Sequence, residues 1–307
     1  MTRTKWHNWA GNQMCSPETI LSPRTEEELV TIVKDAISSN SRVKAIGTGH
    51  SFTGAALTDG ILLDLSQYSE ITDVDKKNNL VTVQTGKKLE DLNPELWGHG
   101  LSMSDLGDIA YQSVGGAMST GTHGTGLTFG CLATQIVGAR VITGEGDVLE
   151  CSRTKEPDLF RSAIVGVGAA GLLSTVTLQL EDRFNLRAQE IMLPLDEVIA
   201  KQDEFAESNE HFEYFCHPGG SMAFTKRNNR TTTPVQPDSV WRRRYEEDIF
   251  PHVYRANRVV ERYLPKVGAF LSRSMRPSGR EDYVDRSYSV FTSERKMKFV
   301  EMEYFIP

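Results

Sequence analysis

The stretch Arg42–Gly54, RVKAIGTGHSFTG in one-letter code, constrains the fold of this chain more than any other. An apolar, strand-like run over Val43–Ile46 leads into a loop that carries three glycines and one histidine, His50. Glycine lets a backbone turn sharply and approach a ligand closely, and successive free N–H groups in such a loop form an anion-binding concavity. The loop therefore predicts a site for a phosphate-bearing cofactor with His50 within reach. A glycine-rich turn with an incidental histidine is the alternative.

Composition narrows the classes of partner. The chain has 307 residues, of which 39% are hydrophobic and 24% charged, and its net charge is -7. That length allows two domains, and the negative charge argues against nucleic acid or an anionic membrane as a bulk partner. No apolar run reaches the roughly 18 residues of a membrane span, and the N-terminus lacks the apolar core of a signal peptide.

The cysteines and histidines point away from disulfides and metals. Cys15, Cys131, Cys151 and Cys216 lie far apart and form no CxxC pair, so we expect free thiols in a reducing cytoplasm. The seven histidines show no ligand spacing, so we predict no metal site.

The first half of the chain alternates short helices and strands. Thr25 is a good N-cap with Glu28 at the capping-box position, and the helix that follows has one apolar face made of Leu29, Ile32, Val33, Ala36 and Ile37. Further patterns predict strands at 43–46, 60–65, 135–142 and 148–151, with a hairpin turn at 144–147 between the last two. They also predict a hairpin of 70–74 with 80–84 and a helix at 88–97.

A long polar, glycine-rich tract, Ser104–Gly126, is expected to lack regular structure. Stretches of this length inside a globular domain are uncommon and usually functional. A low-complexity linker is the alternative, but apolar residues interrupt the tract.

A second glycine tract, Gly166–Gly171, matches GxGxxG literally. A dinucleotide-binding fingerprint needs a strand before it and a helix after it. Here residues 158–165 read as a helix and residues 172–180, which are β-branched and alternating, read as a strand. A Rossmann-type NAD site is therefore not expected, whereas a glycine loop lining a cofactor remains open.

The composition of the sequence changes after Arg183. Glycine becomes less frequent, and the patterns predict charged helices that alternate with short strands. We place the domain boundary there, giving domains 1–183 and 184–307. The patterns predict helices at 195–209, 241–250 and 254–263, strands at 212–215 and 222–227, and loops at 231–238 and 275–285.

Taken in order, the tracts at 46–54, 113–126 and 165–180 carry a family resemblance, supported by Asn8–Asn12 (NWAGN) and Glu301–Tyr304 (EMEY). The chain resembles the vanillyl-alcohol-oxidase type of FAD-linked oxidases, with a PCMH-type FAD-binding domain. Within that superfamily it is similar to the L-gulono-1,4-lactone and D-arabinono-1,4-lactone oxidases, with alditol oxidase as a neighbour. The resemblance implies an α+β fold: a two-subdomain FAD-binding domain, then a partial α+β substrate domain with an antiparallel sheet.

The resemblance also implies the cofactor and its contacts. FAD is expected, with His50 as the residue that bonds covalently to the flavin and His123 as a residue that holds its loop by hydrogen bonding. The cofactor-binding residues it implies are Ile46, Gly47, Thr48, Gly49, His50, Ser51, Phe52, Ser113, Gly115, Gly116, Ser119, Gly121, Thr122, His123, Gly124, Gly126, Gly166, Gly171 and Val176.

The implied chemistry is hydride transfer from the carbon that bears a substrate hydroxyl to flavin N5, with O2 as acceptor and hydrogen peroxide as product. The substrate would be a sugar lactone or a polyol. Gly107 matches the position beside the flavin where a small residue favours an oxidase, and Asp108 lies next to it. The alternatives are an alditol oxidase, a dehydrogenase that uses a quinone or cytochrome, and a flavin-binding protein without turnover. We expect the protein in the cytoplasm, either free or associated with a membrane.

Members of this family continue beyond the motif that ends this chain, into a Glu-x-Arg pair that binds substrate hydroxyls and a final His-Trp pair. We therefore expect a C-terminally incomplete chain that stops inside a sheet. Glu301 and Glu303 would share one face of an exposed strand, and we do not assign them the substrate role.

Overall fold

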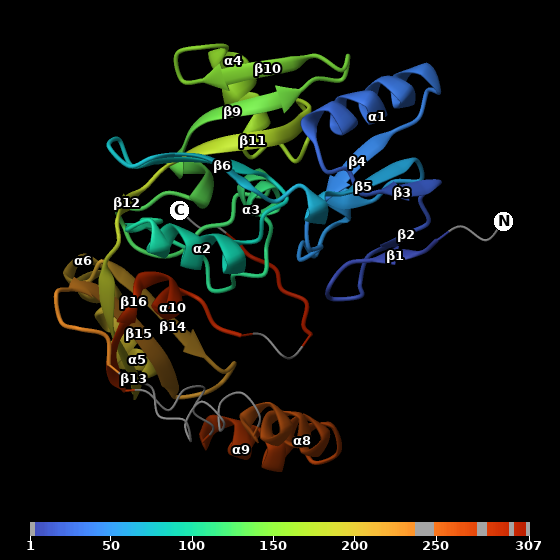
Figure 1. Ribbon diagram of the computed structural model, residues 1–307. Helices are drawn as coiled ribbons and strands as arrows, with labels where there is room; N and C mark the ends of the chain where they lie inside the picture. The colour runs from blue at the N-terminus through green and yellow to red at the C-terminus, as the bar shows by residue number, and fades with distance from the viewer. Residues whose placement is uncertain (1–3, 237–248, 275–280, 295–297, 305–307) are drawn as a thin grey trace. The chain divides into compact units, whose positions relative to one another are not determined.

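The computed structural model describes residues 4–236, 249–274, 281–294 and 298–304 (Figure 1). The chain divides into two compact units: unit 1 comprises Met1–Gly124, Gly130–Arg183 and Lys298–Pro307, and unit 2 comprises Thr125–Phe129 and Phe184–Met297. These units differ from the predicted domain ranges in two places, because residues 125–129 group with unit 2 and residues 298–304 group with unit 1.

A small parallel sheet begins unit 1. Its strands are β3 (Thr19–Leu21), β4 (Val43–Ile46) and β5 (Ile61–Asp64), in the order β3-β5-β4. Helix α1 (Glu26–Ser38) joins β3 to β4. The Thr25 hydroxyl caps this helix by accepting a 3.2 Å hydrogen bond from the Glu28 N–H, as predicted. The Glu28 carboxylate accepts instead from the Arg24 N–H, at 2.6 Å, so the capping box is shifted by one residue.

A five-stranded antiparallel sheet forms the second layer of unit 1, in the order β10-β9-β11-β7-β6. Its strands are β6 (Ile71–Asp75), β7 (Leu80–Gln84), β9 (Ile136–Ile142), β10 (Val148–Ser152) and β11 (Leu172–Gln179). The β6–β7 and β9–β10 pairs are the two hairpins that the sequence predicts.

One apolar cluster joins α1 to both sheets. Leu29 and Val33 of α1 pack with Leu63 of β5 and Ile142 of β9, and all four are buried. Ile37, predicted on the same buried face, is 51% exposed, because it lies near the C-terminal end of α1, beyond this cluster. Each side chain buried in such a cluster contributes about 1.5–3 kcal/mol by leaving water, so this packing holds the two sheets of unit 1 on α1.

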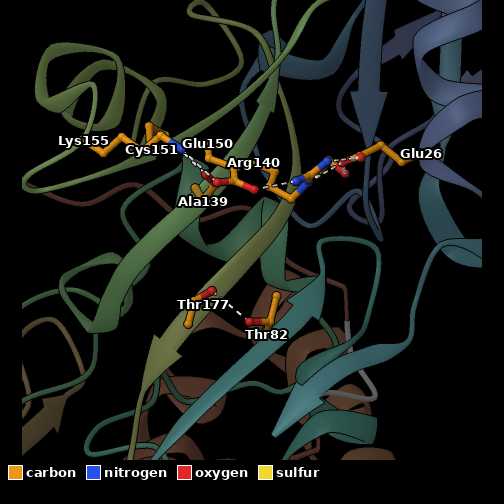
Figure 2. A network of polar contacts seen from close by, with 9 residues as sticks. Glu26, Thr82, Ala139, Arg140, Glu150, Cys151, Lys155 and Thr177 are labelled. Atoms are coloured by element: carbon orange, nitrogen blue, oxygen red, sulfur yellow. Dashed lines mark hydrogen bonds and ion pairs between the residues drawn. The ribbon is translucent and has the colours of Figure 1, made fainter. Parts of the chain in front are cut away.

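A polar network accompanies that packing (Figure 2). The Glu26 carboxylate on the first turn of α1 receives hydrogen bonds from Arg140 of β9, at 2.6 and 3.1 Å, and from the Ser174 hydroxyl of β11, at 2.6 Å. The Ser174 hydroxyl has one proton, which it donates to Glu26, so the Tyr68 hydroxyl must donate to the Ser174 oxygen, at 2.7 Å. Arg140 also reaches Glu150 on β10, which pairs with Lys155. The network therefore ties α1 to the five-stranded sheet through charge-assisted bonds.

Shorter elements complete unit 1. They are β1 (Trp6–His7) paired with β2 (Met14–Cys15), β8 (Leu101–Ser102) paired with β12 (Glu181–Asp182), α2 (Leu89–Gly98), α3 (Val114–Ser119), α4 (Pro157–Ala163), and 3-10 turns at Gly54–Ala56, Leu65–Gln67 and Leu132–Gln135. Helix α3 corrects the expectation that 104–126 lacks regular structure. Its N-cap Ser113 accepts a 3.2 Å hydrogen bond from the Gly116 N–H, and two adjacent glycines hid this helix from a propensity argument.

Unit 2 is built on a four-stranded antiparallel sheet in the order β14-β15-β13-β16. The strands are β13 (Asn185–Pro194), β14 (His211–Cys216), β15 (Met222–Thr231) and β16 (Asp282–Arg286), and the helices are α5 (Leu195–Ala200), α6 (Gln202–Ser208), α8 (Phe250–Tyr263), α9 (Pro265–Ser274) and α10 (Ser287–Phe291). The predicted α+β class with an antiparallel sheet in the second half is confirmed.

Buried His211 explains why residues 125–129 belong to unit 2. Its Nδ1 lies 2.8 Å from the Thr125 carbonyl oxygen, and its ring stacks on Phe129 with centroids 4.5 Å apart. Burial lowers the pKa of His211, which the bond to Thr125 opposes in part, so the ring is neutral at pH 7 and its Nδ1–H donates to the carbonyl.

Several predictions for the second half were wrong. The helix expected at 195–209 breaks at Lys201, which leaves helical geometry with φ -117° and ψ 13°. Strand β13 was missed, and β16 occupies part of the loop expected at 275–285. Most of the helix expected at 241–250 lies outside the described residues.

The C-terminal segment 298–304 belongs to no strand, so Glu301 and Glu303 do not share a strand face. All four cysteines are free thiols. Within the described ranges, no helix is both long enough and apolar enough to cross a membrane.

The Glu26 network predicts a pH-dependent loss of stability. The hydrogen bond from Arg140 lowers the pKa of the Glu26 carboxyl, so the folded state holds that proton less tightly than the unfolded chain. The stabilisation is therefore present above the ordinary glutamate pKa of about 4.3 and is lost as pH falls through the folded value. Because Arg140 is partly exposed, we expect Glu26→Gln to lower the free energy of unfolding at pH 7 by about 1 kcal/mol, and by less at pH 4.

Urea unfolding at both pH values measures this difference. Glu27→Gln is the matched control, because it removes the same charge from the same helical turn at an exposed position. An equal effect of both substitutions would reduce the network to a helix-dipole contribution.

Candidate functional site

A cavity of about 660 Å³ lies within unit 1. Its walls come from the C-terminal end of α1, strand β4 with the loop after it, helix α3, the β9–β10 turn, and the loop before β11. This volume is within the range of about 300–1,000 Å³ that is typical of small-molecule and cofactor sites. The walls belong to segments far apart in sequence, which the packing of α1 between the two sheets brings together.

The loop over residues 47–51 forms one wall, and its backbone is shaped for close approach. Gly49 has φ +70°, and a Cβ there would lie 3.0 Å from the Trp6 ring. A Cβ on Gly47 would overlap the Ser113 hydroxyl oxygen, at 1.8 Å. The backbone N–H groups of residues 48–51 donate no hydrogen bond to any residue that the structure describes. Four adjacent unused donors at a cavity wall are the arrangement that binds a phosphate.

The charge of the lining favours an anion. The described lining contains Arg42 and Lys44 and no aspartate or glutamate. Arg42 is paired with the exposed Asp59 carboxylate, at 2.7 and 2.8 Å. Among the described residues, the Lys44 ammonium has only a long, 3.5 Å hydrogen bond to the Val167 carbonyl. Free amides, an available cation and the absence of acid in the described lining fit the diphosphate of a dinucleotide such as FAD.

His50 lines the same cavity and is held by rings. Its imidazole stacks on Trp9, with centroids 4.9 Å apart, and on Tyr111, at 5.9 Å. Burial lowers the pKa of His50, although the Glu90 carboxylate opposes the shift. The imidazole is therefore neutral at pH 7, with one ring nitrogen unprotonated and nucleophilic.

Residues 167–171 form another part of the cavity lining, and the loop Gly166–Gly171 carries backbone strain. Val165 and Val167 have φ +62° and +52°, a region that β-branched residues rarely adopt. The Val167 N–H bonds to the Ser119 carbonyl at 3.3 Å and thus anchors the loop to α3. As predicted, this loop joins a helix, α4, to a strand, β11. Strain of this kind persists only where surrounding structure enforces it, and it is common at binding sites.

The structure brings about half of the predicted cofactor-binding residues together at the cavity: Ile46, Gly47, Thr48, Gly49, His50, Ser51, Ser113, Gly115, Gly116, Ser119 and Gly171. The others lie outside its lining: Phe52, Gly121, Thr122, His123, Gly124, Gly126, Gly166 and Val176. Val176 is fully buried in β11, so its side chain belongs to the core, and Gly126 belongs to unit 2. Gly107, which is buried, and Asp108, which is exposed, also lie outside the lining.

His123 has a different environment from His50. Its Nδ1 lies 2.7 Å from the Gly124 carbonyl oxygen, and its Nε2 lies 2.7 Å from a carboxylate oxygen of Glu303. Burial alone would lower the pKa of His123, but the Gly124 bond and the Glu303 carboxylate outweigh it and raise the pKa. Both ring nitrogens then act as donors, and the histidine fastens the C-terminal segment to its own loop.

Sequence reasoning missed several lining residues. Lys44 lies in a strand that we interpreted only from its apolar neighbours, Thr143 was assigned no role, and Gly144 was predicted as part of a hairpin turn. No local signal marks them, because only the packing of β4 and β9 about α1 brings them to one cavity. Among the described residues, no group of three or more His, Cys, Asp or Glu side chains is placed to hold a metal ion.

The chain is similar to known protein families and to individual known proteins. A family profile described as "FAD binding domain" matches residues 17–152, and one described as "D-arabinono-1,4-lactone oxidase" matches residues 176–307. An L-gulono-1,4-lactone dehydrogenase of Mycobacterium tuberculosis is 37% identical, over 98% of this chain and 70% of its own length. An L-gulonolactone oxidase of Bos taurus is 30% identical, over 99% of this chain and 69% of its own length.

Among solved structures, cholesterol oxidase from Brevibacterium sterolicum superposes with a TM-score of 0.77 at 16% sequence identity. The match covers 94% of this chain, which spans 61% of the length of that structure. At this identity the likeness is one of fold alone.

The close contact at Gly47 predicts that this position does not accept a side chain. In Gly47→Ala the new methyl would displace Ser113 and so remove the cap of α3. We expect the free energy of unfolding to fall by about 1–3 kcal/mol, with weaker FAD binding measured by fluorescence titration. Gly98→Ala is the control, because a Cβ there meets nothing within 4 Å. Equal stability of the two variants would contradict this packing.

Proposed function

This chain belongs to the family of FAD-linked L-gulono-1,4-lactone and D-arabinono-1,4-lactone oxidoreductases, and we propose on this premise that it oxidises a sugar-1,4-lactone with FAD. The observation that carries the proposal is the cavity of unit 1, where unused amides of residues 48–51, Lys44 and a neutral His50 share one lining without acid among its described residues. The acceptor we propose is O2, with hydrogen peroxide as product.

When bound, FAD supplies a ring that takes a hydride at N5 from the carbon bearing a substrate hydroxyl and returns two electrons to an acceptor. Residues of the chain bind the cofactor and hold it in position. The amides of residues 48–51 and the Lys44 ammonium bind the phosphates and fix the position of the cofactor. His50 offers a neutral ring nitrogen at the same wall, and we propose it as the point of covalent attachment to the flavin.

Gly107 is the residue on which we base the choice between O2 and another electron acceptor. By family resemblance it lies beside the flavin, where a residue without a side chain leaves O2 a path. A Cβ at this position would lie 3.2 Å from both the His123 carbonyl oxygen and the Thr122 methyl group, so the space is tight. The relative from M. tuberculosis is named a dehydrogenase, so a quinone or cytochrome as acceptor is the second candidate.

Free cysteines support a reducing compartment. We propose the cytoplasm, where the protein is either free or associated with a membrane.

The spectrum of the purified chain is the first test. Yellow colour that stays with the protein after acid precipitation supports attachment at His50, and His50→Ala should release it. A colourless chain that FAD does not reconstitute would overturn the flavoprotein assignment. Peroxide is then assayed with L-gulono-1,4-lactone, D-arabinono-1,4-lactone and xylitol. A flavin-loaded chain that reduces neither O2 nor a dye with any of them would favour a non-catalytic FAD-binding role.

The position of Lys44 in the lining predicts that replacing this residue weakens the binding of phosphate-bearing ligands only. We expect Lys44→Met to weaken binding of FAD and of ADP by about tenfold, the value of one charge-assisted hydrogen bond, and to leave riboflavin binding unchanged. Arg42→Met is the control, because Arg42 is already paired with Asp59. Calorimetric titration of the three ligands measures the effect. Equal loss for riboflavin would show that Lys44 acts through the fold and not on a phosphate.

Gly107 predicts a change of acceptor. We expect Gly107→Ala to lower the rate of peroxide formation by about tenfold or more while reduction of an artificial dye persists, because the methyl group closes the gap beside Thr122 and His123. A parallel loss of both rates would indicate a general packing defect.

A further inference from the structure

The Asn8–Asn12 motif has no role in the function proposed above, yet its contacts converge on the His50 loop. The Trp9 N–H donates to the Gly49 carbonyl at 2.8 Å, and the buried Asn8 amide donates to the Ser51 carbonyl at 3.0 Å. The Asn12 amide donates to the Phe52 carbonyl, also at 3.0 Å. The motif thus donates hydrogen bonds to the carbonyl groups of residues 49, 51 and 52. It makes no hydrogen bond with the N–H groups of residues 48–51, which are therefore available to a ligand in the cavity.

The side chain of Trp9 extends this support to the His50 ring. The indole and imidazole planes differ by 24°, and the Tyr111 ring, from the tract before α3, lies 13° from the imidazole plane. Both pairs are stacked, and such ring contacts are worth about 0.5–1.5 kcal/mol beyond the area they bury. Rotation of the imidazole about its side-chain bonds would break both contacts.

Ring contacts, and no hydrogen bond from a residue that the structure describes, hold the His50 imidazole. Within the described part of the chain, neither ring nitrogen has a hydrogen-bond partner. Histidines that act in chemistry usually have one nitrogen fixed by a carbonyl or carboxylate, as His123 does here. At His50, stacking is the contact that fixes the ring; it occupies the ring faces and leaves the edge with the two nitrogens free of these contacts. His50 itself lines the cavity.

We propose that Trp9 and Tyr111 are positioning residues, which hold the His50 imidazole by stacking so that its edge meets the bound flavin. This inference deepens the proposed function and rests on the role given there to His50. It also assigns the Asn8–Asn12 motif a role: the motif anchors Trp9 and the loop as one piece.

The test separates positioning from binding. Apoprotein variants Trp9→Leu, Trp9→Phe and Tyr111→Leu are incubated with FAD at saturating concentration, and the flavin retained after acid precipitation is followed over time. We expect Trp9→Leu and Tyr111→Leu to slow attachment by about tenfold with unchanged non-covalent FAD affinity. Trp9→Phe, which keeps a ring to stack, should stay close to the native rate. Trp97→Leu, which removes a tryptophan from α2, is the control.

A second readout does not depend on attachment. In the apoprotein, we expect the ring current of Trp9 to shift the NMR signal of the His50 Cε1 proton upfield, and burial, to which the indole contributes, lowers the pKa of His50. Loss of the indole in Trp9→Leu should move that signal downfield and the pKa toward its ordinary value, with an unchanged circular dichroism spectrum as the check on folding. If native protein never attaches flavin, the proposed attachment fails while this readout still decides the positioning.

Two outcomes would overturn the proposal. One is attachment by both leucine variants at the native rate with an unmoved His50 signal. The other is an equal defect in Trp9→Leu and Trp9→Phe, because stacking could not then be the cause.

Discussion

The packing of helix α1 against both sheets governs the arrangement of unit 1. Helix α1 packs against both sheets through Leu29 and Val33, and this burial carries Glu26 on its first turn into contact with the five-stranded sheet. An unpaired charge there would be costly, so Arg140 and Ser174 supply donors. The pairing joins α1 to the five-stranded sheet, and apolar packing holds β4, whose end begins the cofactor loop, on the same helix.

In the loop after β4, the backbone carbonyl groups and the backbone N–H groups have different roles. Its carbonyl groups at residues 49, 51 and 52 bond to the segment around Trp9, and its N–H groups at residues 48–51 face no described acceptor. Val167, which has a left-handed backbone conformation, lies in another part of the cavity lining. The lining thus contains unused donors, which the phosphates of a bound dinucleotide would satisfy, and strained backbone of the kind that is common at binding sites.

Prediction succeeded where local chemistry decides structure. The Thr25 cap, the two hairpins and the glycine loop each depend on residues within a few positions of one another. It failed where distant contacts decide. Strand β13 carries Glu190 at a buried position, where the Tyr283 hydroxyl bonds to it, so the usual alternation is obscured. Val198 and Phe205 are seven residues apart and both buried, a spacing that one helix or two satisfy equally, so the break at Lys201 left no trace.

The sequence by itself determined the fold class, the cofactor family and the glycine tracts that lie about the site, because glycine and capping residues act through their immediate backbone. Only the tertiary structure decided which of those residues share a cavity. Lys44 enters it and Val176 does not, since the side on which a strand residue faces a ligand depends on what packs behind the strand. The stacking of Trp9 and Tyr111 on His50 was likewise invisible, because three rings from separate segments meet only after α1 and the sheets are in place.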